Sequence, residues 1–251
     1  MVKIFFIPPM GHSSDFYKYI KKTEDMVFLD YPYNQETVDQ ENSLDYLAQY
    51  FAKTVTKHMA ESQKYSDIIL VGVSLGATLS LKINQLLENR VKKLVLIAPG
   101  GLKVARARKE MIKHAINNLE QEEFIKKALG LEQQANFLDH FSDKKENAKE
   151  YYPIISSFWS DKYEKTQGTS FKKMAIDALE VNYEELLVEY QDKIHLLWGK
   201  KDKIFSMRHY NKFYKLLNQA DLDLHDQVGH YLPIEAPQHL DKLMDNYVSN
   251  I

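Results

Sequence analysis

A serine between two glycines is the first candidate for chemistry in this sequence. The segment Gly72-Val73-Ser74-Leu75-Gly76 directly follows a short apolar run. This spacing is typical of a sharp turn from a strand into a helix, in which the serine backbone is strained and the glycines avoid clashes. Such a turn raises the hydroxyl above the end of the strand, beside the free N–H groups that begin a helix. The pattern therefore predicts Ser74 as a nucleophile.

A serine hydroxyl needs a neighbouring base to become nucleophilic near neutral pH. The chain has nine histidines, and His230 has the most distinctive setting. It lies in the short loop Gly229-His230-Tyr231-Leu232-Pro233, directly after the last expected strand. His12 is the alternative, because it follows the first expected strand. The sequence favours His230 as the base, since the remaining histidines fall within helical or strand patterns.

The third group needed is a carboxylate that orients the imidazole and stabilises its cation. Asp202 lies four residues after the expected strand that ends at Trp198. The strand before it ends in Ala98-Pro99-Gly100-Gly101, which offers no carboxylate. A simple turn-capping role beside Lys203 is the alternative for Asp202. The chain order Ser74, Asp202, His230 favours the catalytic interpretation.

Short apolar runs alternate with longer amphipathic stretches, which is typical of βα units around a mostly parallel sheet. We expect an α/β fold with about six strands flanked by helices. The expected strands are Val2–Ile7, Met26–Asp30, Asp67–Val73, Lys92–Ala98, Lys193–Trp198 and Asp221–Asp226. The expected helices include one capped by Ser43, and others over Ala77–Leu87, Met207–Leu217 and Pro237–Val248.

Residues 102–168 break this alternation, because they show helical periodicity and no convincing strand. We interpret residues 1–101 and 169–251 as the core. The block between them is interpreted as a helical cap inserted before the strand that bears Asp202. A set of ordinary peripheral helices is the alternative. Phe158 and Trp159 lie in the cap, where they either line an apolar substrate pocket or pack between cap helices.

Composition excludes several other classes of function. Lys and Arg number 33 against 35 Asp and Glu, so no strong positive field attracts a nucleic acid. Without cysteine there is no disulfide, thiolate metal site or cysteine nucleophile. No segment has the length of apolar sequence that spans a membrane. No nucleotide-binding or metal-binding motif is present. We therefore expect a cytoplasmic protein without a cofactor.

Together these motifs resemble the α/β-hydrolase superfamily, in particular its small, cap-bearing serine esterases and acyl hydrolases. The resemblance covers nearly the whole chain outside the cap, and Trp198-Gly199, Glu235 and Pro237 add to it. It implies an oxyanion hole formed by the backbone N–H groups of Leu75 and Met10. Where the family usually has His-Gly, this chain has Pro8-Pro9, and proline has no N–H to donate.

The expected activity is hydrolysis of a carboxylic ester or thioester through an acyl-enzyme. Pro9, Phe158, Trp159 and Tyr231 are the candidates for contact with a small ester or acyl substrate. The alternatives are thioester cleavage or acyl transfer on carrier-bound groups, and a ligand-binding protein without turnover. Basic residues at the start of the cap indicate either a solvated helix face or a dock for an acidic acyl carrier protein. They are Lys103, Arg106, Arg108, Lys109 and Lys113.

Overall fold

A six-stranded sheet in which all neighbouring strands are parallel forms the centre of the molecule. It is seen in the computed structural model, which describes residues 1–32, 43–62, 64–88, 90–142, 145–163 and 169–249. The strand order is β2-β1-β3-β4-β5-β6. The strands are β1 (Val2–Ile7), β2 (Met26–Phe28), β3 (Asp67–Val73), β4 (Val91–Ile97), β5 (Ile194–Gly199) and β6 (Asp221–His225).

The six expected strands are confirmed, and their bounds differ by no more than two residues. In β3, every residue from Ile68 to Val73 is buried, which is why its run of β-branched and aliphatic residues is uniformly apolar. β2 is shorter than expected, because it ends at Phe28 instead of Asp30. In the described part of the chain it is an edge strand that pairs with β1 alone.

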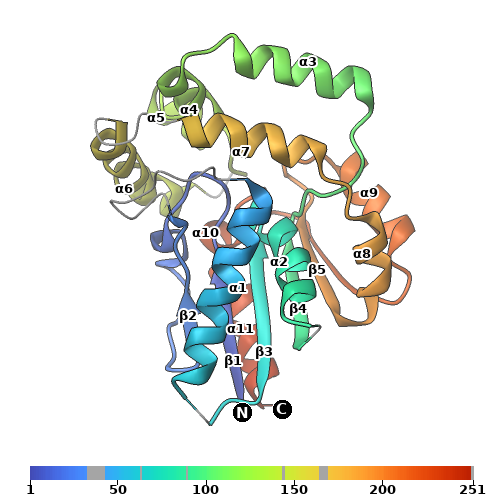
Figure 1. Cartoon of the computed structure of the whole chain (residues 1–251). Coiled ribbons are helices and arrows are strands. Elements are labelled where there is room, and N and C mark those ends of the chain that lie inside the picture. The colour runs from blue at the N-terminus through green and yellow to red at the C-terminus, as the bar shows by residue number, and fades with distance from the viewer. Residues whose placement is uncertain (33–42, 63, 89, 143–144, 164–168, 250–251) are drawn as a thin grey trace.

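Helices cover both faces of the sheet. Figure 1 shows α1 (Leu44–Ala60) and α2 (Leu75–Leu86) in front of the strands and α11 (Pro237–Ser249) behind them. As expected, the Ser43 side chain caps α1, accepting a hydrogen bond from the N–H of Tyr46 at 3.2 Å. The core also contains η1 (Ser14–Tyr17), α8 (Glu184–Glu189), η3 (Gln191–Lys193), α9 (Met207–Leu216) and α10 (Leu232–Glu235).

The sheet has a topological switch point between β1 and β3. From β1 the chain moves outward to β2 and then crosses back to β3 on the other side of β1. Ile7 at the end of β1 is therefore paired with Gly72 near the end of β3. In open α/β sheets, ligands bind in the crevice at such a point, outside the carboxyl ends of the strands. The loop after β1 and the turn after β3 meet at this edge.

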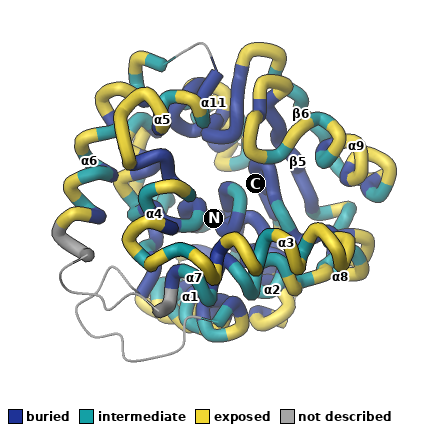
Figure 2. Tube along the Cα trace, turned by 90° about the horizontal axis from the view of Figure 1, so that it is seen from above, coloured by how far each residue is buried: buried dark blue, intermediate teal, exposed yellow. Residues whose placement is uncertain are grey.

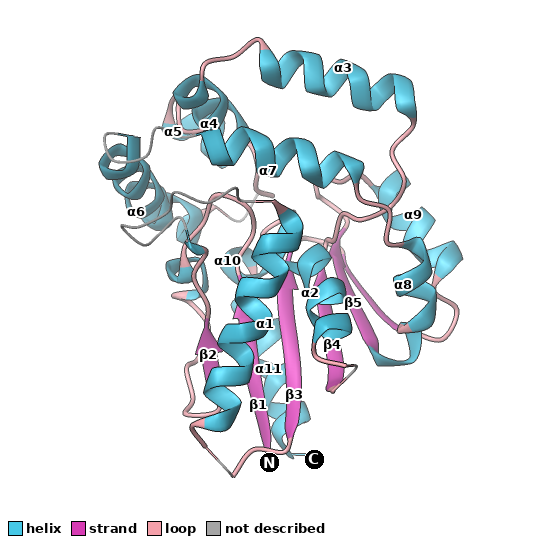
Figure 3. Cartoon of the chain, in the orientation of Figure 1, coloured by secondary structure: helices cyan, strands magenta, loops and turns pink. Residues whose placement is uncertain are grey.

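A layer of helices lies over the carboxyl edge of the sheet, while both termini lie at the opposite end (Figures 1 and 3). It consists of α3 (Arg106–Asn117), α4 (Gln121–Leu129), α5 (Gln134–Leu138), α6 (Glu146–Tyr163) and α7 (Thr169–Glu180). α7 contacts both α3 and α4, and so it belongs to this layer. The predicted cap boundary at residue 168 lies outside the described residues.

The apolar interior continues from the sheet into this layer of helices, α3 to α7 with the described segments between them, which is called the cap below. Seen from above, α3 is largely exposed, whereas segments beneath the cap are buried (Figure 2). A group of buried aromatic side chains joins the loops of the core to cap helices. Its members are Phe16, Phe137, Phe141, Tyr151 and Tyr231. The cap is therefore packed onto the core through a shared hydrophobic cluster.

Candidate active site

Ser74 occupies the strained turn that its flanking glycines predict. Its backbone has φ 53° and ψ −113°, and α2 begins at the next residue. A positive φ at a residue other than glycine is uncommon and costs of order 1–3 kcal/mol. Backbone hydrogen bonds hold the turn, since the Ser74 N–H donates to Ile97 and the Ser74 carbonyl accepts from the Thr78 N–H. The partly exposed Ser74 side chain thus lies at the carboxyl edge of the sheet.

Both glycines of the motif are required by close backbone approach. A Cβ atom on Gly72 would lie 2.4 Å from the carbonyl carbon of Gly76. A Cβ atom on Gly76 would lie 2.3 Å from the Ile7 oxygen and 2.6 Å from the Pro8 oxygen. The contact between Gly76 and Pro8 shows that the start of α2 packs directly against the loop after β1. The nucleophile turn and the predicted oxyanion loop are therefore neighbours.

Asp202 and His230 form a buried hydrogen-bonded pair. The Nδ1 atom of His230 lies 2.8 Å from Oδ2 of Asp202, and each side chain is only 1% exposed. The other carboxylate oxygen, Oδ1, accepts the N–H groups of Ile204 at 2.8 Å and Phe205 at 2.7 Å. These three bonds leave the carboxylate little freedom to rotate. The two residues that the sequence selected as orienting acid and base are thus brought together, beyond the ends of β5 and β6.

The loop that carries His230 is held by a second buried carboxylate, Glu235. Its Oε2 atom accepts the N–H of Gly229 at 3.0 Å, and its Oε1 atom accepts the N–H of Tyr231 at 3.3 Å. Oε2 also accepts the N–H of Ser142, from the cap, at 2.9 Å. In the sequence, Glu235 is part of the family resemblance, which implies no role for it. Its position five residues after a loop histidine was the one available signal.

The predicted oxyanion loop is a tight turn. The His12 N–H donates to the Pro9 carbonyl at 3.2 Å, which closes a four-residue turn. Gly11, at the third position of this turn, has φ +82°, as a type II turn requires. Among the described residues, the Met10 N–H has no hydrogen-bond acceptor. Leu75 is the first residue of α2, so its N–H has no acceptor within the helix.

His12, the alternative base, lies in a different environment from His230. It is fully buried, and burial lowers its pKa to about 3, with smaller contributions from His140 and His230. Its Nδ1 lies 3.0 Å from the Tyr151 hydroxyl, whereas its Nε2 has no partner among the described residues. The partner of its Nδ1 is a neutral hydroxyl, whereas that of His230 is a carboxylate. The acid-base arrangement therefore favours His230.

The four candidates for substrate contact lie around this edge of the sheet. Pro9 and Tyr231 are buried, and the Tyr231 ring lies 5.0 Å from that of His230. Trp159 is buried in the cap, where its Nε1 donates to the Gly11 carbonyl at 2.7 Å. Phe158 packs edge-on against Trp159 at 5.4 Å. Their contact with a substrate stays a prediction.

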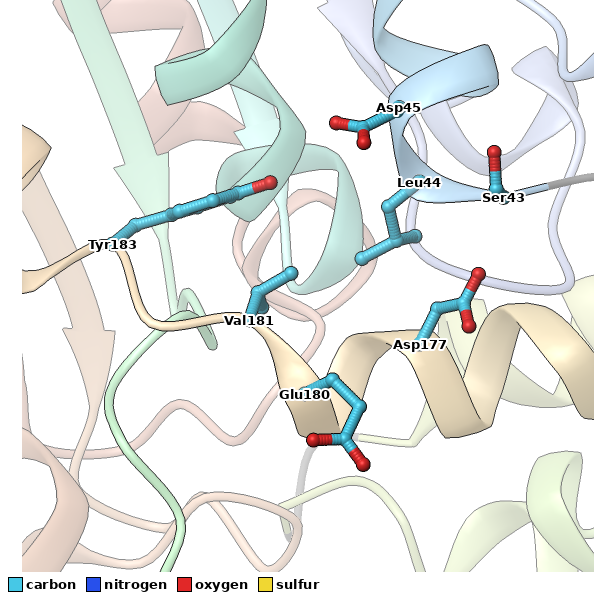
Figure 4. Close-up of a pocket in the computed structure, with 7 residues that line it drawn as sticks. All are labelled: Ser43, Leu44, Asp45, Asp177, Glu180, Val181 and Tyr183. Carbon is cyan, nitrogen blue, oxygen red and sulfur yellow. The ribbon is translucent and has the colours of Figure 1, made fainter.

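A pocket of about 290 Å³ lies between the start of α1 and the end of α7 (Figure 4). Ser43, Leu44 and Asp45 line it from the core, and they face Asp177, Glu180, Val181 and Tyr183 from α7 and the residues that follow it. Burial, together with the charge of Asp45, raises the pKa of Tyr183 to about 12, so its hydroxyl stays protonated. The lining contains none of the predicted site residues, and its carboxylates disfavour an anionic ligand.

The basic stretch at the start of the cap is partly neutralised. Lys109 and Lys113 both form ion pairs with Glu180 on α7. Lys103, Arg106 and Arg108 are exposed. Docking of a carrier protein on this helix stays a prediction.

Two broader properties bear on cofactors and membranes. Within the described ranges, no three His, Asp or Glu side chains are grouped as ligands for a metal ion. No helix in the described part of the chain has the length and apolar character needed to cross a bilayer.

Comparisons with known proteins agree with this architecture. Solved structures with the same overall fold include a thermophilic esterase from Thermogutta terrifontis, with 13% identity and a TM-score of 0.75 over 100% of this chain and 90% of the esterase. An esterase from Exiguobacterium antarcticum is 15% identical, with a TM-score of 0.73 over 99% and 92% of the two chains. A serine hydrolase from Cycloclasticus zankles is also 15% identical, with a TM-score of 0.72 over 99% and 90%.

A search of curated protein sequences found no significant match. By contrast, the family model described as the alpha/beta hydrolase fold matches residues 43–237, which is more than half of the chain. The matched range contains the strained Ser74 turn and the buried Asp202–His230 pair. The chain belongs to the α/β-hydrolase fold family.

Proposed function

We propose that this protein is a serine hydrolase that cleaves carboxylic esters through Ser74, His230 and Asp202. The observation that carries the proposal is the buried hydrogen bond between His230 and Asp202, at the same sheet edge as the strained Ser74 turn. A carboxylate held in place by three hydrogen bonds is the group that a catalytic imidazole needs as its partner.

The Asp202–His230 bond determines which nitrogen of His230 can act as the base. An ionised carboxylate only accepts hydrogen bonds, so the proton in the 2.8 Å contact lies on Nδ1 of His230. In the neutral ring, Nε2 then carries a lone pair. This tautomer accepts a proton from the Ser74 hydroxyl, and Asp202 stabilises the cation that results.

The first half-reaction forms an acyl-enzyme. The Ser74 Oγ attacks the ester carbonyl carbon while its proton passes to Nε2 of His230. The N–H groups of Leu75 and Met10 stabilise the oxyanion of the tetrahedral intermediate. The bond from carbon to the leaving alkoxide then breaks, and His230 returns the proton to the departing alcohol.

The second half-reaction restores the enzyme. A water molecule attacks the acyl carbon while His230 takes one of its protons. The tetrahedral intermediate collapses, the bond to the Ser74 Oγ breaks, and the serine regains its proton from His230. The carboxylic acid is released, and neither half-reaction requires a redox step. A thioester would react in the same way with a thiol as the leaving group.

Reaction with a fluorophosphonate probe tests the proposal without knowledge of the substrate. We expect labelling of Ser74, located by peptide mass spectrometry, and its loss in both Ser74→Ala and His230→Ala proteins. His58→Ala, which changes a histidine on α1 with no place in this mechanism, serves as the matched control and should label normally. A folded wild-type protein that does not label would overturn the proposal and favour a ligand-binding protein without turnover.

The leaving group is then identified by rate. The purified protein is assayed against p-nitrophenyl esters and acyl thioesters of matched chain length, with and without an added alcohol as a competing acceptor. Faster turnover of esters supports ester hydrolysis. A clear preference for thioesters, or new ester formed from the added alcohol, would replace it with thioester cleavage or acyl transfer.

A further inference from the structure

The loop from Ile7 to His12 is fixed through its carbonyl groups, three of them by aromatic side chains. The Tyr17 hydroxyl donates to the Ile7 carbonyl at 2.7 Å, and the Tyr31 hydroxyl donates to the Pro8 carbonyl at 2.9 Å. Both tyrosines belong to the core. The Gly11 carbonyl accepts the indole N–H of Trp159 at 2.7 Å, and Trp159 belongs to cap helix α6.

Two consecutive turn peptides connect the Trp159 indole to the Met10 N–H. The indole donates to the Gly11 carbonyl. The same peptide unit carries the His12 N–H, which donates to the Pro9 carbonyl at 3.2 Å. That carbonyl shares its peptide unit with the Met10 N–H. The described chain contains no cis peptide bond, so each N–H points opposite to the carbonyl of its own unit.

This chain of hydrogen bonds ends at the Met10 N–H, a donor without an acceptor in the described part of the chain. Because the Pro9 carbonyl points into the turn, the Met10 N–H points out of it. Among the described residues it has no acceptor. Consecutive hydrogen bonds also polarise one another, which strengthens the donor at the end of the chain. A free, oriented N–H beside the start of α2 is suited to an oxyanion.

Packing fixes Trp159 and Gly11 against each other. Trp159 is 4% exposed and packs edge-on against Phe171 of α7 at 5.2 Å. A Cβ atom on Gly11 would lie 2.8 Å from the Leu129 side chain of α4 and 3.1 Å from Phe171. Side chains of three cap helices therefore pack against this turn, and a Cβ atom at position 11 would crowd Leu129 and Phe171 and strain the positive φ of the turn.

The geometry points to Trp159 as a positioning residue of the oxyanion hole, acting from the cap through the Gly11 and Pro9 peptide units. This inference rests on the proposed function, because it assigns the Met10 N–H to the oxyanion. It also explains how a loop with two prolines keeps one N–H correctly directed. The cap then contributes to the chemical step itself.

Trp159→Phe removes the indole N–H and keeps an aromatic ring. We expect kcat to fall by about tenfold to hundredfold, while KM changes less than twofold, because the bond orients a group that acts on the transition state. Affinity for a trifluoromethyl ketone, which forms a tetrahedral adduct with the serine, should fall by the same factor as kcat/KM. Amide hydrogen exchange in a peptide covering residues 8–12 should become faster.

Tyr19→Phe is the matched control, because it also removes a bond between the cap and the core. The Tyr19 hydroxyl donates to the Asn147 carbonyl at 2.8 Å, and that carbonyl belongs to the cap and not to the oxyanion loop. This variant should keep kcat and inhibitor affinity. Equal losses of kcat in both variants would overturn the inference, because they would show a general effect of loosening the cap.

A second variant guards against a packing defect in Trp159→Phe. Benzothienylalanine at position 159 replaces the indole N–H by sulfur and keeps the shape of the side chain, and it should reproduce the loss of kcat. Wild-type kcat with this residue would overturn the inference, as would an increase in KM at constant kcat. Absence of turnover and of Ser74 labelling in the wild type would refute the proposed function. The exchange measurement would still test whether Trp159 holds the loop.

Discussion

Replacing Glu235 by glutamine tests whether this buried carboxylate holds His230, the proposed catalytic base, in place. Glu235 is 7% exposed and accepts three backbone N–H groups, from Ser142, Gly229 and Tyr231. Glutamine can keep its single oxygen where Oε2 lies, which serves two of them. Its NH₂ group then faces the Tyr231 N–H, so that two donors meet. The variant is isosteric, and its effect comes from hydrogen bonding.

The magnitude follows from the bonds that change. One bond is lost, and two bonds to a charged acceptor become bonds to a neutral one. A hydrogen bond to a charged group contributes about 1.5–3 kcal/mol and a neutral one about 1 kcal/mol, so the free energy of unfolding should fall by at least about 2.5 kcal/mol. In a chain of this size that corresponds to a decrease in Tm of at least roughly 5 °C. A displaced His230 loop should also lower kcat about tenfold with KM nearly unchanged.

Urea unfolding and steady-state kinetics on the same preparations measure both effects. Asp241→Asn is the control, because Asp241 also accepts a backbone N–H, that of Lys21 at 2.9 Å, but at an exposed site. It should leave Tm and kcat close to the wild-type values. A Glu235→Gln protein with wild-type stability and wild-type kcat would show that Glu235 does not hold the His230 loop in place. Reduced stability with unchanged kcat would leave Glu235 a structural role only.

Three further predictions concern the site itself. Ser74→Gly should abolish activity and still raise Tm by a few degrees in a melting experiment, because relief of about 1–3 kcal/mol of strain exceeds the entropic cost of glycine. If Ser74→Gly were less stable than Ser74→Ala, the backbone at residue 74 would not be strained. Asp202→Asn should lower kcat by about 10⁴, because the amide no longer fixes the His230 tautomer, while urea unfolding shows that the fold is retained. A loss below tenfold would remove Asp202 from the triad. His12 stays neutral in the folded protein, whereas in the unfolded chain it binds a proton below pH 6.5. The free energy of unfolding should therefore fall by about 1.4 kcal/mol for each pH unit as the pH decreases from 6.5 toward 3. Urea unfolding between pH 7 and 5 should show that the free energy of unfolding depends less steeply on pH in His12→Asn than in the wild type. Equal dependence in the two proteins would contradict the lowered pKa of His12.

The strands and the Asp202–His230 pair could be predicted from the sequence because their signals are local. A strand buried on both faces, such as Ile68–Val73, is a continuous apolar run whatever the rest of the chain does. The Ser74 turn is specified by two glycines within five residues, and the glycine contacts show why. Asp202 and His230 were found because each follows a strand at the same sheet edge. Topology then brings them together.

The supporting groups could not be predicted, since their partners are far away in sequence. Trp159 bonds to Gly11 across 148 residues, and Glu235 bonds to Ser142 across 93. No periodicity or motif in the sequence predicts which backbone group a buried side chain will bond. From the sequence, Trp159 is therefore equally compatible with a substrate contact and with internal packing. The structure adds a hydrogen bond to the oxyanion loop that neither alternative contains.

These contacts would oppose any separation of the cap from the core. Separating α6 from the core would break the Trp159–Gly11 bond, and moving Ser142 would break its bond to Glu235. Each break leaves a buried polar group unpaired, which costs about 1–3 kcal/mol. α3 has only Ile116 fully buried along its length and is bound to α7 through Lys109, Lys113 and Glu180. Such exposed ion pairs contribute little. We therefore expect α3 to open first, because the bonds of Trp159 and Ser142 tie α6 and the segment before it to the loops of the proposed site.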